Sequence, residues 1–312
     1  MTPPDSFAAR SPSGFVLALP GGRTLDLTPF AGPLAERGAH VMGILNVTPD
    51  SFSDGGRFLA LDDALRQAEA MLNEGATLLD VGGESTRPRG AAYGAGAEPV
   101  SEDEEKRRVV PVVEALARRF PEALVSVDTY KPGVAAAALG AGAHVVNDVT
   151  GLRLYPGMAD VCAAFGAPLI VMHSTGVPGE APPMLPDAGV VEAVVAGLRA
   201  SVRVAHAAGV AGVVVDAGFG FGKTAAGNLR LVGATGRLLA ELGRPVLVGV
   251  SRKSTIGAVL GTAGAPAPVE ARLFGTLGAT AVAVLRGATL VRTHDVRATA
   301  EMLRVLAAAS GG

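Results

Sequence analysis

The sequence contains no Trp and a single Cys, and aromatic residues make up only 4% of its 312 residues. One Cys cannot form a disulfide within the chain, and Cys162 lies in the apolar helical stretch "ADVCAAFG", where a small buried side chain is expected. No run reaches the roughly 18 uncharged apolar residues that a membrane helix needs. The first residues, "MTPPDSFAARSPSG", lack the apolar segment of a secretory signal, so we expect a cytoplasmic location.

An excess of charge of one sign is also missing, because 27 Lys and Arg nearly balance 29 Asp and Glu. Without a basic run interleaved with aromatic residues, nothing in the sequence indicates nucleic-acid binding. Hydrophobic residues are plentiful, at 49%, and they suffice for a large core of small, branched side chains. The length fits two average domains or one large α/β barrel.

Short apolar runs rich in Val, Ile and Leu recur along the chain. Their nearly continuous hydrophobicity is typical of parallel strands that are covered on both faces. The runs are "HVMGILNVT" (40–48), "TLLDVGG" (77–83), "ALVSVDT" (123–129), "HVVNDVT" (144–150), "PLIVMHS" (168–174), "GVVVDAG" (212–218), "PVLVGVS" (245–251) and "ATLVRTH" (288–294).

Helix-length amphipathic stretches lie between these runs, and several end in Gly, as helix carboxyl termini favour. One of them, residues 228–244, is expected to be a single helix. Alternating strands and helices predict a (β/α)₈ TIM barrel over 39–312, with an open doubly wound sheet as the alternative. Residues 13–28, with Pro20-Gly21-Gly22 at the turn, predict a β-hairpin in an extension over 1–38 that caps the amino-terminal mouth of the barrel.

Polar side chains stand where each predicted strand ends, which is the end at which such barrels bind ligands. Turn and helix-cap preferences could account for any one of them. They account less well for Asp128 and Asn147, which lie between apolar residues, because burying an unpaired polar group costs several kcal/mol. We therefore expect both side chains to have a partner.

The polar residues form two predicted sets. Asp128, Asn147, Asp216 and Lys253 follow four different strands, and their donors and acceptors suit a flat heterocycle with amino, ring N–H and carbonyl groups. Asn46, Arg292 and His294 come from the first and last strands, which adjoin in a closed barrel. This second set suits an anion, with Asn46 able to offer an oxygen to Mg²⁺.

Other motifs are discounted. The stretch "AGFGFGKT" (217–224) has Ala217 where a Walker phosphate loop needs Gly, and its Gly spacing does not fit a dinucleotide fingerprint. His40, His144 and His206 lie away from the predicted mouth and are expected to be structural.

Taken in order, several motifs resemble those of the dihydropteroate synthases, a family of pterin-binding enzymes. They are "GILNVTPDSFSDGG", "DVGGESTRP", "SVDTYKP", "NDVTG", "GFGFGKT", "GVSRKSTIG", "GTLGAT" and "RTHDV", and they span roughly residues 40 to 300. The resemblance implies a TIM barrel that is usually a homodimer. It also implies a transferase that joins p-aminobenzoate to 6-hydroxymethyl-7,8-dihydropterin pyrophosphate and releases pyrophosphate with Mg²⁺.

Residue by residue, the resemblance assigns the pterin to Asp128, Asn147, Asp216 and Lys253. It assigns Mg²⁺ and the pyrophosphate to Asn46, with Arg292 and His294 on the same anion. Of these, Asp128, Lys253, Arg292 and His294 are the expected catalytic residues. The resemblance assigns p-aminobenzoate to Phe52, Asp54, Thr86, Arg87, Pro88, Phe221 and Ser254, the last at a predicted helix start.

The sequence departs from the family pattern in two loops after strands, at residues 83–101 and 172–185. The longer first of these raises the question whether p-aminobenzoate is turned over. Two alternatives therefore stay open: a pterin-binding paralogue without synthase activity, and a pterin-binding methyltransferase domain that needs a corrinoid partner.

Overall fold

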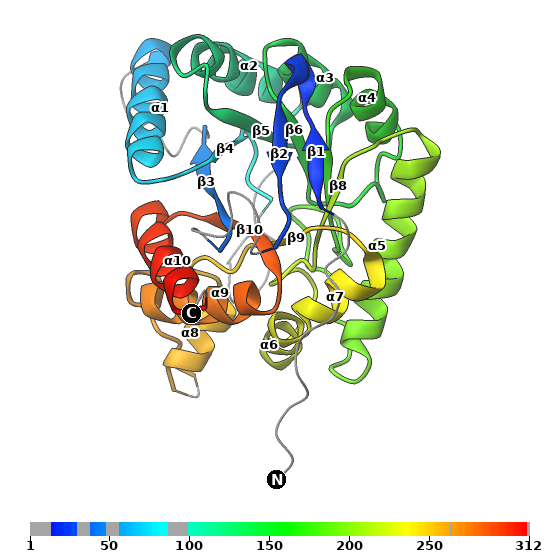
Figure 1. The fold of residues 1–312 in the computed structure, drawn as a ribbon, viewed down its shortest axis with the longest axis vertical. Coiled ribbons are helices and arrows are strands. Elements are labelled where there is room, and N and C mark those ends of the chain that lie inside the picture. The colour runs from blue at the N-terminus through cyan, green and yellow to red at the C-terminus, as the bar shows by residue number, and fades with distance from the viewer. Residues whose placement is uncertain (1–13, 30–37, 48–55, 87–98, 263, 311–312) are drawn as a thin grey trace.

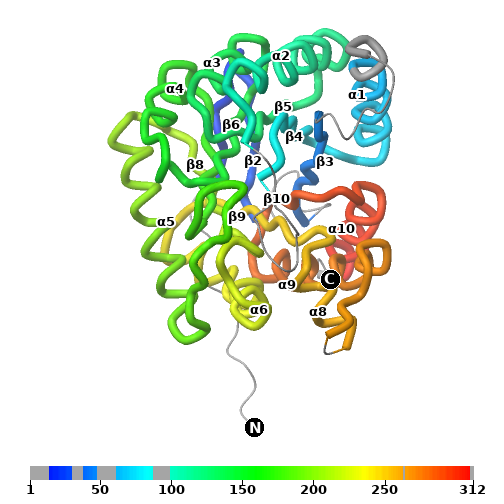
Figure 2. Tube along the Cα trace, turned by 180° about the vertical axis from the view of Figure 1, so that it is seen from behind, coloured from blue at the N-terminus to red at the C-terminus, as the bar shows by residue number. Residues whose placement is uncertain are grey.

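The computed structural model describes residues 14–29, 38–47, 56–86, 99–262 and 264–310. Its architecture is a closed barrel of parallel strands in the order β10-β3-β4-β5-β6-β7-β8-β9, surrounded by helices (Figures 1 and 2). The predicted (β/α)₈ barrel is confirmed, and the open sheet is excluded because β10 pairs with both β3 and β9. The barrel strands are β3 (His40–Asn46), β4 (Leu78–Gly82), β5 (Leu124–Asp128), β6 (Val145–Asp148), β7 (Leu169–Met172), β8 (Val213–Asp216), β9 (Val246–Val248) and β10 (Ala288–Thr293).

Helices such as α2, α5 and α10 have amphipathic sequences, and apolar side chains of the helices pack on the outside of the strands in one continuous core. The helix α2 has clear end signals: Ser101 accepts a hydrogen bond from the backbone N–H of Glu104 (3.2 Å), acidic residues fill its first turn and Arg118 and Arg119 its last. The helices are α1 (Gly56–Asn73), α2 (Glu102–Arg119), α3 (Pro132–Gly140), α4 (Met158–Phe165), α5 (Val190–Ala207), α6 (Ala225–Gly233), α7 (Thr235–Leu242), α8 (Ser254–Leu260), α9 (Leu273–Leu285) and α10 (Val296–Ser310), with short 3₁₀ turns η1 (Pro20–Gly22) and η4 (Val269–Arg272).

The stretch 228–244, predicted as one helix, is divided between α6 and α7. Ala234 leaves helical geometry, and the hydroxyl of Thr235 donates to the carbonyl of Val232 at 2.9 Å. In an unbroken helix that carbonyl would accept from the backbone N–H of Gly236. The side-chain hydrogen bond therefore stabilises a break that the hydrophobic pattern does not reveal. The short helix α8 was predicted only through its start at Ser254, and it was not among the helix-length amphipathic stretches.

The predicted hairpin is present as β1 (Val16–Ala18) and β2 (Thr24–Asp26), an antiparallel pair that lies across one end of the barrel (Figure 1). Its buried leucines and Phe15 pack in one cluster with an apolar side chain from each barrel strand. Those strand residues are Met42, Leu78, Leu124, Val145, Ile170, Val214, Leu247 and Leu290. The hairpin thus closes the amino-terminal end with apolar contacts, while the division of the chain at 38/39 stays a prediction.

The apolar layer identifies which residues of each strand point into the barrel interior. Because every second residue faces the same side, the residues two positions further along each strand also point inward. They are Ile44, Asp80, Ser126, Asn147, Met172, Asp216, Gly249 and Arg292. A layer rich in polar groups therefore lies above the apolar layer, towards the carboxyl-terminal mouth, and Asn46 and Asp128 follow one layer higher.

None of the helices in the described part of the chain is long and apolar enough to cross a membrane.

Candidate active site

A guanidinium that bridges two buried carboxylates lies at the centre of the polar interior. Arg292 Nε donates to Oδ2 of Asp80 at 2.6 Å, and its Nη2 donates to Oδ2 of Asp128 at 2.6 Å. The same Asp80 oxygen also accepts from the amide nitrogen of Asn147 at 3.1 Å. Four strands, β4, β5, β6 and β10, are thus tied together by one hydrogen-bonded network, and the expected partners of Asp128 and Asn147 are found.

This network does not use all of its acceptors. Oδ1 of Asp80 and Oδ1 of Asp128 are buried, and neither has a hydrogen-bond partner among the described residues. A buried acceptor without a partner costs roughly 1–3 kcal/mol, so such atoms are rare outside functional sites. The two oxygens are suited to accept N–H donors from a bound molecule.

Burial raises the pKa of Asp128 to about 7; the cation of Arg292 opposes the rise, and the neighbouring Asp80 adds to it. For Arg292, burial alone would lower the pKa, but the two aspartates outweigh it and raise the pKa above its ordinary value. The arginine therefore stays charged, while Asp128 is poised between its neutral and ionised forms near neutral pH.

Asp216 and Lys253 form a second pair of charged groups at the mouth. Burial raises the pKa of Asp216, against the opposing effects of Lys253 and of the Gly218 N–H, which donates to Asp216 Oδ1 at 2.7 Å. Burial lowers the pKa of Lys253 to about 8, and Asp216 limits the drop. The ammonium of Lys253 donates to the carbonyl of Phe219 and lies 4.8 Å from the ring centre of Phe221. The first predicted set therefore converges on one mouth, as expected.

The second predicted set lies at the same mouth. His294 Nδ1 is 3.0 Å from the hydroxyl of Ser251, and burial together with Arg292 and Arg252 lowers the pKa of His294 to about 4. His294 is therefore neutral at pH 7, so it offers a hydrogen bond rather than a charge. Asn46 is the last residue of β3 and is exposed. In the strand register it pairs with Gly82 of β4, and Gly82 pairs with Asp128 of β5.

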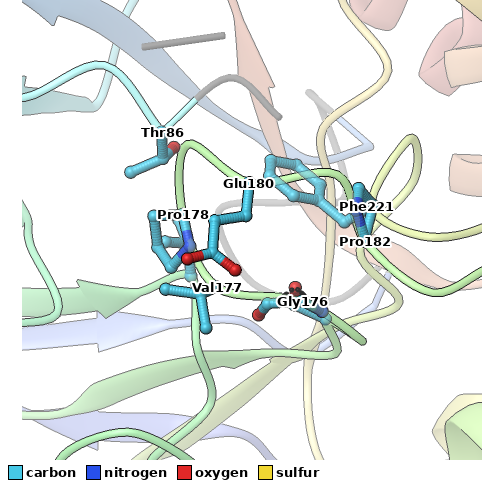
Figure 3. Close-up of a pocket in the computed structure, with 9 residues that line it drawn as sticks. Thr86, Gly176, Val177, Pro178, Glu180, Pro182 and Phe221 are labelled. Carbon is cyan, nitrogen blue, oxygen red and sulfur yellow. Dashed lines mark hydrogen bonds between the residues drawn. The ribbon is translucent and has the colours of Figure 1, made fainter. Parts of the chain in front are cut away.

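A further pocket opens beside this mouth, and Figure 3 shows its lining residues. Thr86 and Phe221, both predicted to contact p-aminobenzoate, lie on its wall. Most of the remaining lining comes from the loop after β7, which contributes Ser174, Gly176, Val177, Pro178, Glu180 and Pro182, and Val149 follows β6. The unusual loop at 172–185 thus lines the same pocket as Thr86 and Phe221.

The other residues predicted for that substrate are placed differently. Ser254 is the first residue of α8, as expected for a helix start, but it does not line this pocket. Phe52, Asp54, Arg87 and Pro88 lie outside the described residues. Their assignments stay predictions.

Sequence reasoning missed two buried charged residues in the site. Asp80 lies inside "TLLDVGG" and is fully buried, so the argument used for Asp128 would have applied to it as well. Lys223 belongs to the discounted motif 217–224; its ammonium donates to the carbonyls of His173 (2.8 Å) and Gly218 (2.9 Å). Burial lowers the pKa of Lys223 to about 7, although the nearby Asp216 opposes the effect.

The histidines predicted to be structural have structural contacts. His40 bonds to the carbonyl of Asp26 and to Thr77, His144 to Arg23 and the backbone N–H of Val125, and His206 to Arg244. Cys162 is buried in α4 and unpaired. The described residues contain no group of three or more His, Cys, Asp or Glu side chains that could hold a metal ion by themselves.

A family model described as pterin binding enzyme matches residues 42–294, which is most of the chain and nearly the whole barrel. The chain belongs to the pterin-binding enzyme family. Within that family it is similar to the dihydropteroate synthase of Escherichia coli K12, with 44% identity over 86% of this chain and 91% of that protein. It is also similar to a probable bifunctional folylpolyglutamate synthase/dihydropteroate synthase of Haloferax volcanii, with 48% identity over 83% of this chain but only 29% of that longer protein.

A solved structure supports the same relationship in three dimensions. The dihydropteroate synthase of Xanthomonas albilineans, determined with 4-aminobenzoic acid, matches with a TM-score of 0.81 and 41% identity, covering 96% of this chain and 99% of that one. The resemblance proposed from the sequence motifs is therefore confirmed.

Proposed function

We propose that this pterin-binding enzyme is a transferase of folate biosynthesis with dihydropteroate synthase activity. It condenses p-aminobenzoate with 6-hydroxymethyl-7,8-dihydropterin pyrophosphate to give 7,8-dihydropteroate and pyrophosphate. The observation that carries this proposal is the polar set at the barrel mouth, where Asp128, Asn147, Asp216 and Lys253 lie together in a chain that is similar to a synthase over 86% of its length.

Recognition of the pterin follows from complementary hydrogen bonding. The carboxylates of Asp128 and Asp216 accept from the amino and ring N–H groups, the amide of Asn147 can donate and accept, and Lys253 donates to the ring carbonyl. Asp128 accepts best in its ionised form, which its pKa of about 7 makes available at and above neutral pH. The apolar layer beneath excludes water and strengthens these bonds.

Departure of pyrophosphate requires positive charge and hydrogen-bond donors at the mouth. Arg292 uses only Nε and Nη2 in its two contacts with aspartate, so further N–H donors remain for an anion. His294 adds a neutral donor. The dihydropterin, held by Asp128 and Asp216, can stabilise positive charge at its methylene carbon. We therefore propose a dissociative substitution: the bond from that carbon to the pyrophosphate oxygen breaks first, the arylamine nitrogen then forms the new bond to the carbon, and this nitrogen loses its proton to water.

We propose Asn46 as the protein ligand of Mg²⁺. A single exposed amide oxygen fits this ion when the substrate phosphates and water supply the remaining oxygens, because Mg²⁺ commonly binds through few protein groups. The bound ion would neutralise charge on the departing pyrophosphate. We expect chelation with EDTA to abolish turnover and added Mg²⁺ to restore it, while Ca²⁺, which tolerates less regular coordination, restores it poorly.

The second substrate is proposed to occupy the pocket beside Thr86 and Phe221. The ring of Phe221 offers an aromatic face next to the ammonium of Lys253, and Thr86 adds a hydroxyl at the start of the loop after β4. Phe52, Asp54, Arg87, Pro88 and Ser254 are proposed to complete this site from the neighbouring loops.

The test is a reconstituted assay with purified protein, the pterin pyrophosphate, p-aminobenzoate and Mg²⁺, with dihydropteroate measured by chromatography. Product that depends on all three additions supports the proposal. Tight pterin binding without product would favour the non-synthase paralogue. Methyl transfer that appears only with a corrinoid protein would favour the methyltransferase alternative. Unchanged turnover and pterin affinity in Asp128→Asn would contradict the assignment of the pterin site.

We also propose a cytoplasmic homodimer. Large apolar side chains are exposed on the neighbouring helices α8, α9 and α10, among them Leu260, Phe274, Leu285 and Val305. Phe274 is the most exposed of these, at 82%. Exposed apolar side chains on adjacent helices are typical of subunit interfaces, and we propose that a second copy of the same helices buries them with two-fold symmetry.

A further inference from the structure

Asp80 is the buried charge that the proposed function leaves without a role. It lies one layer below Asp128 inside the barrel, and its side chain is fully buried. A carboxylate in such a place is retained at considerable cost in desolvation, so its contacts deserve an explanation beyond stability.

The contacts of Asp80 are concentrated on one oxygen. Oδ2 accepts from Arg292 Nε and from Asn147 Nδ2, so a single atom holds two side chains that come from strands on opposite sides of β4 and β5 in the barrel order. An ionised carboxylate can only accept hydrogen bonds. It therefore requires Asn147 to present its NH₂ group downward, which turns the amide oxygen towards the other side, where an amino group of a ligand can reach it.

The same contact fixes the guanidinium. With Nε held by Asp80, the plane of Arg292 is set so that Nη2 meets Asp128 rather than forming a two-pronged pair with it. Oδ1 of Asp128 is consequently left without a partner among the described side chains. Without Asp80, Arg292 could turn and occupy both oxygens of Asp128, which would remove the acceptor that a pterin needs.

We propose that Asp80 is a positioning residue of the pterin pocket: through one carboxylate oxygen it orients the amide of Asn147 and keeps Arg292 from closing over Asp128. The inference rests on the proposed assignment of Asp128 and Asn147 to the pterin. It adds that the charge of Asp80 opposes ionisation of Asp128. Other charged groups that act on Asp128 are Arg292, Glu105, Asp148 and Lys253.

Two substitutions separate the geometry of Asp80 from its charge. Asp80→Asn keeps both hydrogen bonds, because Arg292 Nε is always a donor and forces the new amide to place its oxygen where Oδ2 was. It deletes only the charge. Asp80→Ala removes the two hydrogen bonds as well as the charge. Asp26→Asn, in the hairpin, is the control for loss of one negative charge far from the site.

The experiment measures binding of 6-hydroxymethyl-7,8-dihydropterin pyrophosphate by calorimetry from pH 5.5 to 9, with thermal unfolding of each protein as a check on folding. Wild type and Asp26→Asn should lose affinity as pH falls through about 7, where Asp128 becomes protonated. Asp80→Asn should retain the high-pH affinity within about three-fold, with its midpoint lowered by about one pH unit, since a neighbouring like charge has been removed. Asp80→Ala should bind at least about ten-fold more weakly at every pH.

The proposal is overturned if Asp80→Asn keeps the wild-type midpoint, or if a folded Asp80→Ala binds as well as wild type. Asp80→Asn is nearly isosteric, so its midpoint tests the effect of the charge even where Asp80→Ala fails to fold. In that case Asp80→Ser, whose shorter side chain cannot hold both Arg292 Nε and Asn147 Nδ2, takes the place of Asp80→Ala, and unchanged binding by this folded variant overturns the proposal. A failure of the underlying function has a different signature, because wild type would then not bind the pterin pyrophosphate, or Asp128→Asn would bind it with an unchanged pH dependence.

Discussion

Replacing Asp128 by Asn is expected to stabilise this protein at alkaline pH while it weakens pterin binding. The pKa of Asp128 is raised from its ordinary value of 3.8 to about 7, chiefly by burial. A carboxyl whose pKa is higher in the folded protein than in the unfolded chain destabilises the fold progressively as pH rises between those values, and the cost is constant above about 7. Asn cannot ionise, so the variant avoids this cost.

The size of the effect follows from the same two values. Each pKa unit corresponds to about 1.4 kcal/mol, so an ionised Asp128 costs the folded state on the order of 4 kcal/mol at pH 8. At pH 5 the pH lies only about one unit above the pKa of Asp128 in the unfolded chain, so the cost to the folded state is roughly 2 kcal/mol. The stability of the variant relative to wild type should therefore rise by about 2–3 kcal/mol between pH 5 and pH 8.

The assay is urea denaturation of both proteins at pH 5 and pH 8. Unfolding is monitored by circular dichroism, because the chain has no Trp whose fluorescence could report it. Comparing the two pH values removes any constant effect of altered packing or of a weakened contact with Arg292. Asp26→Asn is the control: the hydrogen bonds from Thr28 lower the pKa of Asp26, so its variant should show no such gain. A stability difference between Asp128→Asn and wild type that is the same at both pH values would refute the argument.

Three further predictions concern other parts of the molecule. Gly218→Ala should destabilise the fold by more than about 3 kcal/mol in urea titrations, because Gly218 has φ +68° and an added Cβ would lie 1.8 Å from the carbonyl oxygen of His173. Gly140→Ala is the control and should not destabilise the fold in this way, because a Cβ added there meets nothing within 4 Å. Equal destabilisation by both substitutions would contradict the strain argument. Phe221→Ala should raise KM for p-aminobenzoate about ten-fold in steady-state assays with little change in pterin affinity, whereas a parallel loss of both would place Phe221 in the pterin site. Phe274→Asp should convert the proposed dimer to a folded monomer in sedimentation experiments, and a dimer that persists would exclude the α9 surface from the interface.

The local elements of this fold could be predicted because their patterns are short-range. Each barrel strand was located to within one to three residues, since buried runs between Gly-rich helix ends are visible in any window of ten residues. The hairpin was equally clear from Pro20-Gly21-Gly22. The split between α6 and α7 could not be predicted from the sequence pattern, because it depends on a single hydrogen bond from the hydroxyl of Thr235 to the carbonyl of Val232.

The chemistry of the site could be predicted only in part. The sequence alone determined that polar residues end every strand and that Asp128, Asn147, Asp216 and Lys253 gather at one mouth, because parallel strands of a barrel share a direction. Which of them touch depends on how the whole chain folds. Arg292 meets Asp80 across 212 residues of chain, His294 becomes neutral through burial, and the loop after β7 supplies a wall of the second pocket. Contacts and pKa values depend on distance and desolvation in the folded state, and neither is encoded in the local pattern of residues.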